Sequence, residues 1–325
     1  MSPVPDLHHV VLMSASDTDA EAKGGIGAIL LGVGIMLGVM VVGTILLVPR
    51  IVLSRLRRPP ARPDGYGETP LATPPDAATV ARRARLLALQ LRRLGDPVPM
   101  HVITNAGGPL DDARRAEHEA RRAAQERDIA TALADDAVAA EATPDEVRFL
   151  RKDARAFSRR DVLDVSWRAE SLAVLLWAQR RLDALPPFDE QMDPEKLLEL
   201  GRTPLEGTPA LRAPEELATM QSRAKLWHWR SRTRQLEEEG TPLPEQLPVK
   251  SYEEIVRITV EAAQEEGSLD AVRDGDFKAM GKSFRYLSAD EWSSVQSIIM
   301  ERHRALNWLC GYAPDNRWDD VPTHT

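Results

Sequence analysis

The longest hydrophobic run of this chain extends from Gly24 to Val48 and contains no charged residue. As an α-helix this run would measure about 37 Å, which exceeds the roughly 30 Å of hydrocarbon in a bilayer. A cleaved signal peptide has a basic start and a shorter apolar run, whereas the charged residues before this run are mostly acidic. The pattern therefore predicts an uncleaved transmembrane helix over residues 24–48, which makes the lipid bilayer a partner of these residues.

Basic residues gather on one side of the predicted transmembrane helix. Lys23 is the only lysine or arginine before it, and five arginines follow it closely: Arg50, Arg55, Arg57, Arg58 and Arg62. Because positive residues stay on the cytoplasmic side, residues 1–23 are expected to form a short extracytoplasmic N-terminus. The rest of the chain is expected in the cytoplasm, held at the cell membrane by this single pass. Met13 is as plausible a start as Met1, because residues 1–12 contribute no recognisable element.

Three glycines of the run, Gly27, Gly34 and Gly38, fall on similar faces of the predicted helix. Small residues spaced four positions apart allow two membrane helices to approach closely. This face would permit a homodimer, although glycine is also common in membrane helices that do not pair.

Proline and glycine recur through the second half of residues 49–76, which excludes regular structure and predicts a tether that is basic at its start. Residues 77–325 then form the predicted domain, mainly α with a possible minor β part. Helical periodicity predicts helices over 77–94, 111–141, 160–185, 194–200, 214–239, 252–266 and 289–309, a short helix after Thr143-Pro144, and an extended segment within 277–287. The helix over 160–185 is apolar nearly all round, which is typical of the centre of a domain.

The chain carries a net charge of −8, and an acidic chain is a poor general binder of nucleic acid. Two basic stretches leave alternatives open. The arginines between Arg82 and Arg93 could rest on anionic lipid, or could face water while a leucine stripe enters the core. The run from Arg223 to Arg234 interleaves Trp227 and Trp229, as in single-strand binders, but is also an ordinary amphipathic helix. The second interpretation is favoured for both, so no nucleic acid is expected as a partner.

Two polar clusters within apolar helices are candidate sites. The first contains Trp167, Arg168 and Glu170, and the second, on the last helix, contains Glu301, Arg302, His303, Asn307 and Trp308. These side chains either line a pocket between the two helices or form structural ion pairs. His303 and Cys310 are two helical turns apart, too far for a thiolate–imidazole pair.

No phosphate loop, HExxH pair or GxSxG elbow occurs, so no catalytic residue, metal site or cofactor is predicted. Cys310 is the only cysteine, which excludes an intramolecular disulfide. A membrane-tethered domain that binds an unidentified protein is therefore the leading hypothesis. The alternative is an enzyme or small-ligand binder with its pocket between the Trp167 and Trp308 helices.

Several stretches in combination carry a resemblance to a known family. They are Leu94-Gly95 with Pro97-Val98-Pro99, Thr143-Pro144 with Glu146 and Phe149-Leu150, Ser166 to Glu170, Val174 to Ala178, Met300 to Gly311, and Trp318-Asp319-Asp320 with Thr323. Over about residues 80–325 the chain resembles the bacterial domain-of-unknown-function family 4272. The resemblance implies a soluble, mainly helical domain without an established function, so no catalytic residue is carried over. Members usually end in Thr-Asp-Thr, where this chain has Thr323-His324-Thr325, and mostly lack a membrane helix, which makes the anchor an addition.

Overall fold

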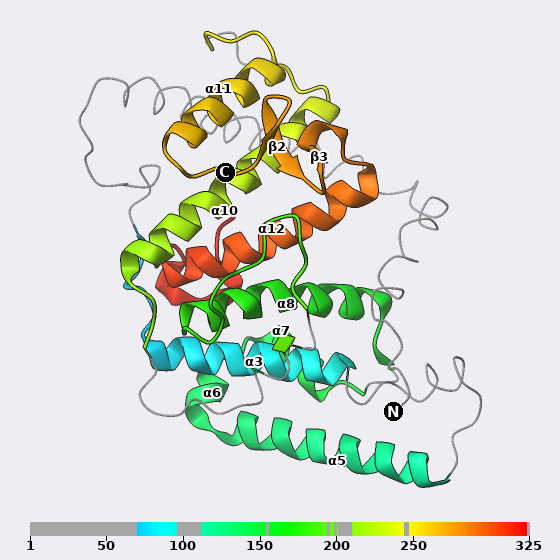
Figure 1. Ribbon diagram of the computed structural model, residues 1–325. Helices are drawn as coiled ribbons and strands as arrows, with labels where there is room; N and C mark the ends of the chain where they lie inside the picture. The colour runs from blue at the N-terminus through cyan, green and yellow to red at the C-terminus, as the bar shows by residue number, and fades with distance from the viewer. Residues whose placement is uncertain are drawn as a thin grey trace, which may run out of the picture. The chain divides into compact units, whose positions relative to one another are not determined.

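The structure is a computed structural model that describes residues 70–95, 112–153, 156–193, 196–197, 200, 210–243 and 247–323 (Figure 1). The predicted transmembrane helix over 24–48, with Gly27, Gly34 and Gly38, lies outside the described residues, as do the N-terminal segment and the tether up to residue 69. In the described part of the chain, none of the helices is both long enough and apolar enough to span a bilayer.

The prediction of a mainly helical fold is confirmed. The described helices are α3 (Ala77–Gly95), α5 (Asp112–Ala134), α6 (Asp136–Glu141), α7 (Pro144–Arg151), α8 (Arg159–Ala178), α10 (Pro214–Glu238), α11 (Tyr252–Glu265) and α12 (Ala289–Leu309). Short 3-10 turns lie before α12, at Phe284–Tyr286, and after it, at Pro314–Asn316 and Trp318–Asp320. The described residues divide into two compact units, a large one within Glu68–Trp229 and Ser294–His324, and a small one within Arg230–Ser293.

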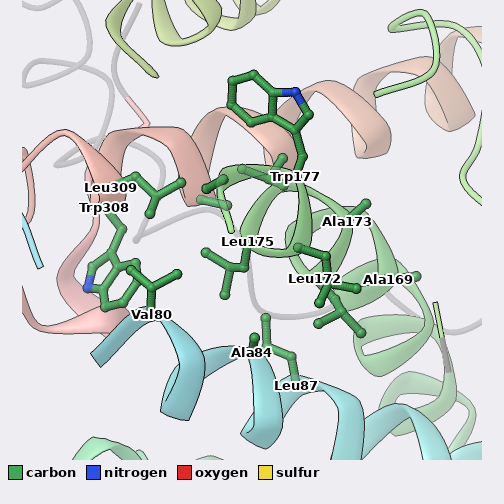
Figure 2. Close-up of a cluster of buried hydrophobic side chains, with 14 of the residues drawn as sticks. Val80, Ala84, Leu87, Ala169, Leu172, Ala173, Leu175, Trp177, Trp308 and Leu309 are labelled. Atoms are coloured by element: carbon green, nitrogen blue, oxygen red, sulfur yellow. The ribbon is translucent and has the colours of Figure 1, made fainter. Parts of the chain in front are cut away.

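Helix α8 is the centre of the large unit, as its apolar sequence predicts. It lies between α3 and the C-terminal part of α12 (Figure 1). Every residue from Leu172 to Ala178 is at most 5% exposed. Figure 2 shows Leu172 and Leu175 on the side of α8 that faces Val80, Ala84 and Leu87 of α3, whereas the Trp177 ring points to the opposite side; Trp308 of α12 belongs to the same cluster. The all-round apolar sequence of α8 is therefore explained by neighbours on several sides.

Helix α3 is buried on two faces. Its predicted stripe meets α8, whereas Leu86 and Leu89 pack against a second cluster that includes Ile129 of α5 and Val138 of α6. The prediction that the arginines of this helix face water is wrong for two of them. Arg83 is 1% exposed and Arg93 7% exposed, and each bonds to groups of the protein. Helix α3 is thus a core helix of the large unit.

Two predicted helices end earlier in the structure than in the sequence pattern. The expected helix over 111–141 is interrupted at Asp135, whose side chain accepts hydrogen bonds from the N–H groups of Ala137 and Val138 and so begins α6. The helix expected to reach residue 185 ends at Ala178, because Arg180 adopts a positive φ of 60°. Of the helix predicted over 194–200, the described residues 196–197 and 200 are helical.

The small unit contains the minor β part. Strands β1 (Val272–Arg273), β2 (Asp276–Ala279) and β3 (Lys282–Ser283) form an antiparallel sheet in the order β1-β2-β3, with Val272 opposite Phe277 and Lys278 opposite Ser283. Both hairpin turns, at residues 274–275 and 280–281, have positive φ at both positions, as tight two-residue hairpins require. The prediction of an extended segment within 277–287 is therefore correct for the first half of this range. The Phe284–Tyr286 turn occupies the second half.

A buried ion pair fixes this sheet to α10. Asp276 is fully buried and accepts hydrogen bonds from Arg230 Nε at 2.6 Å and Nη2 at 2.8 Å, and from the N–H groups of Phe277 and Arg285. Burial alone would raise the pKa of the Asp276 carboxyl, but these hydrogen bonds and the Arg230 charge together outweigh burial and lower it.

Candidate functional site

Four consecutive residues of α12, Glu301 to Arg304, carry polar or charged side chains in the large unit. Successive helix residues point about 100° apart, so the four side chains leave the helix in four directions. A helix with polar groups on every side can be buried only if each group meets a partner. In this structure each of the four does.

Arg302 and Glu170 form an ion pair in which both side chains are 0% exposed. Nε and Nη2 of Arg302 lie 2.8 Å from Glu170 Oε2. Its remaining N–H groups donate to the carbonyls of Pro186, Pro187 and Glu190, and the other oxygen of Glu170 accepts from Met192 N at 2.8 Å. The pair therefore fastens the loop after α8 to both α8 and α12.

The remaining predicted site residues also bond within the protein. Glu301 accepts from Arg168 at 3.3 Å and from Ser171 Oγ at 2.6 Å, and Asn307 accepts from Gln221 at 2.9 Å. Figure 2 shows Trp308 in the apolar cluster, and its Nε1 donates to the Asn316 carbonyl.

His303 faces another histidine. Its Nδ1 lies 2.9 Å from Nδ1 of His228 on α10, so the N–H of one ring donates a hydrogen bond to the nitrogen of the other. Both rings are buried.

Trp167, the last of the predicted site residues, is half-buried on α8. The geometry thus brings the two predicted clusters together, and it favours their interpretation as structural ion pairs and hydrogen bonds.

Two charged residues outside the predicted candidate clusters, Glu146 and Arg304, also bond within the protein. Glu146 accepts from Arg83 Nη1 at 2.8 Å, from Gln90 at 2.9 Å and from the Thr143 N–H at 2.9 Å. The spacing of Thr143 and Glu146 signals a capping box, which the structure contains, but it does not reveal Arg83, which lies 63 positions away.

Arg304 is the second. It donates to the Trp318 carbonyl and lies over the Trp318 ring at 5.2 Å from its centroid. Burial, and after it the charge of Arg168, lower the pKa of the Arg304 guanidinium to about 10. The sequence signal for this contact is the family motif Trp318-Asp319-Asp320, which does not by itself indicate that Arg304 is its partner.

Two neighbouring clefts open on the surface of the large unit, and both are bordered by Thr143 and Asp319. The α7 cleft has a volume of about 650 Å³ and is lined by Gln90, Thr143, Asp145, Glu146, Arg148, Phe149, Arg151, Lys152, Asp161, Asp164, Val165, Arg168 and Asp319. The strap cleft has a volume of about 580 Å³ and is lined by residues 73–76, Thr79, Arg83, residues 140–144 and residues 315–319. Of the predicted site residues, only Arg168 borders either of these two clefts.

Four charged side chains in the α7 cleft are paired with each other. Arg148 lies 2.6 Å from Asp145, and Lys152 lies 2.6 Å from Asp161. The hydrogen bond from Lys152, followed by those from Ser158, lowers the pKa of Asp161 to about 2. Paired, ionised carboxylates of this kind are poor general acids at neutral pH.

Metal binding and cysteine nucleophile chemistry have little support in the described part of the chain. No group of three or more metal-ligating side chains occurs there. Burial raises the pKa of the Cys310 thiol to about 12, which leaves almost no thiolate at neutral pH. The two clefts are lined mainly by polar and charged side chains.

The fold and these sites define a mainly helical protein whose buried polar residues serve ion pairs and helix caps. Residues 113–256 match the model of a family described as "Domain of unknown function (DUF4272)". The match confirms the predicted resemblance to that family within this segment, which is shorter than residues 80–325. No curated protein and no solved structure matches the chain.

Proposed function

We propose that this chain is a membrane-tethered domain that binds another protein through the α7 cleft and the strap cleft. The tether part of the proposal is supported by the uncharged run from Gly24 to Val48 and by the arginines that follow it. The binding part is carried by one observation: the α7 cleft presents acidic and basic side chains that pair at its surface, Arg148 with Asp145 and Lys152 with Asp161.

The shape and charge of the clefts suit a polypeptide partner. They border each other at Thr143 and Asp319, and they present carboxylates beside guanidinium groups and proline rings. Surface ion pairs contribute little stability, so they can exchange partners at low cost when a charged peptide binds. The enzyme alternative, with its pocket between the Trp167 and Trp308 helices, is not proposed, since Glu170 and Arg302 are fully buried in a mutual pair.

Site-specific photo-crosslinking in intact membranes tests the proposal. A photoreactive residue at Arg151, which is exposed and borders the α7 cleft, should trap a second protein that mass spectrometry identifies. The matched control carries the same group at Arg257, an exposed position on α11 of the small unit. Recovery of the chain alone from both positions, or the same proteins from both, would contradict binding through the clefts.

A further inference from the structure

The first described residues of the chain are held against the loop that follows α12. We call residues 70–76 the strap. The N–H groups of Leu71 and Ala72 donate to the Gly311 carbonyl at 2.8 Å and 3.0 Å, and Asn316 Nδ2 donates to the Thr73 carbonyl at 2.6 Å. These bonds join segments that are more than 200 positions apart in the sequence, so they anchor the strap in the large unit.

Gly311 permits this contact because it has no side chain. It ends α12 with a φ of 78°, and a Cβ atom at this position would lie 2.4 Å from the Ala72 carbonyl oxygen. Such a distance is far inside van der Waals contact, and the obstacle is backbone, which cannot rotate away. Any side chain at Gly311 would therefore push the strap off the loop.

The other end of the strap is fixed to α3. Pro75 is buried, and the Asp76 side chain accepts from the Thr79 N–H at 2.7 Å, which caps the first turn of α3. Three prolines in the strap, Pro70, Pro74 and Pro75, reduce the conformations that the free segment can adopt, and so they reduce the entropy lost on docking. The strap thus connects the C-terminal end of α12 to the start of α3.

The strap is also a wall of the strap cleft. Residues 73–76 line one side of that cleft, and residues 315–319 line another. Undocking the strap would remove its own side of the cleft and leave the loop after α12 without three of its hydrogen bonds. The cleft and the docked strap are therefore one structural unit.

We propose that the strap is a latch that couples the chain arriving from the predicted membrane anchor to the strap cleft. When the strap is docked the cleft is complete, and when the arriving chain pulls the strap away the cleft loses a wall. A protein bound in the cleft would favour the docked state, because a ligand shifts an equilibrium toward the state that it binds better. The coupling to a membrane and to a partner rests on the proposed function, whereas the docking itself does not.

Distances between two spin labels on the full chain in lipid nanodiscs test the latch. One label replaces the exposed Leu71 and the other replaces Arg160, which is exposed on α8, in a Cys310→Ala background. A docked strap predicts a single narrow distance distribution. In the Gly311→Ala variant the narrow distribution should be lost and replaced by a broad one.

Gly267→Ala is the matched control, since Gly267 also follows a helix with a positive φ of 68° but has open space where its Cβ would lie. It should keep the narrow distribution. Asn316→Asp is a second variant that removes the Nδ2 donor but tolerates positive φ, and it should broaden the distribution if Gly311→Ala misfolds. A broad distribution before any such substitution, or equal distributions in all variants, would overturn the latch. Neither outcome bears on crosslinking at Arg151, so failure of the latch and failure of the proposed function are distinguishable.

Discussion

Buried arginines hold this protein together at the scale of single residues. Arg302 of the large unit and Arg230 of the small unit are at most 1% exposed, and each meets a fully buried carboxylate in a two-point pair. Removing a charge from water is costly, and only a complete set of hydrogen bonds offsets the cost. Buried pairs of this kind therefore affect stability differently from surface pairs, although the sequence alone shows both simply as charged residues.

The Glu170–Arg302 pair should therefore be sensitive to loss of one charge. We expect Glu170→Gln to lower the free energy of unfolding by about 3 kcal/mol, because Arg302 is left buried without its counter-charge. The matched control is Asp164→Asn on the same helix, which removes an exposed carboxylate paired with Arg160 and should cost less than about 1 kcal/mol. Urea unfolding of both variants, followed by tryptophan fluorescence in detergent micelles, measures the difference. Equal losses of unfolding free energy in the two variants would contradict a larger contribution from the buried pair.

Cys310 should be almost inert in the folded protein. With the pKa raised from 9.0 to about 12, the thiolate fraction at pH 8 falls roughly a thousandfold. Because the chain has one cysteine, the rate of reaction with a disulfide reagent reports this thiol alone. We expect slow reaction at pH 8 and fast reaction in denaturant. A native rate close to the denatured rate would mean that the loop after α12 opens freely.

At the scale of elements, the sequence predicts best where a helix has clear ends. The bounds of α3, α10, α11 and α12 fall within one residue of the predicted ones. The break at Asp135 was missed because an aspartate in an Ala- and Arg-rich stretch signals an exposed helix as readily as a helix cap. The second buried face of α3 was missed because periodicity in one helix does not reveal a second layer against it.

A single buried carboxylate, that of Asp276, holds the small sheet to α10. The pKa of Asp276 is lowered in the folded state, so it stabilises folding above its unfolded-state pKa, near 3.8, and that contribution is lost as the pH falls through the folded-state value. We expect Asp276→Asn to lower stability at pH 7 by about 3 kcal/mol and to flatten the dependence of unfolding on pH below about 4. Thermal unfolding between pH 2 and 7 checks this. An unchanged pH profile would contradict the role given to Asp276.

At the scale of the whole molecule, the matched family segment is not a self-contained core. Residues 113–256 include α8, yet α3 and α12, which cover it, lie outside the match. The candidate site likewise depends on distant segments of the chain. Arg83, Glu146 and Arg304 come together from three segments that no local pattern connects. The sequence could identify polar residues in apolar helices, but their pairing depends on how these helices pack.

A fragment limited to residues 113–256 should therefore fail to fold. Without α3 and α12, the side chains from Leu172 to Ala178 would lose the partners that bury them, and the carboxylate of Glu170 would lose Arg302. We expect aggregation or an unfolded circular dichroism spectrum, whereas residues 70–325 should remain helical. A cooperative thermal transition of the short fragment would contradict this packing scheme.

The central claim is that residues 24–48 tether this domain to a membrane, and alkaline carbonate extraction of cell membranes tests it most directly. The full chain should remain in the membrane pellet. A variant with Leu37→Arg and Val41→Arg should appear in the supernatant, because each arginine at the centre of a membrane helix costs about 2.5–3.5 kcal/mol. Release of the unmodified chain into the supernatant would contradict the tether.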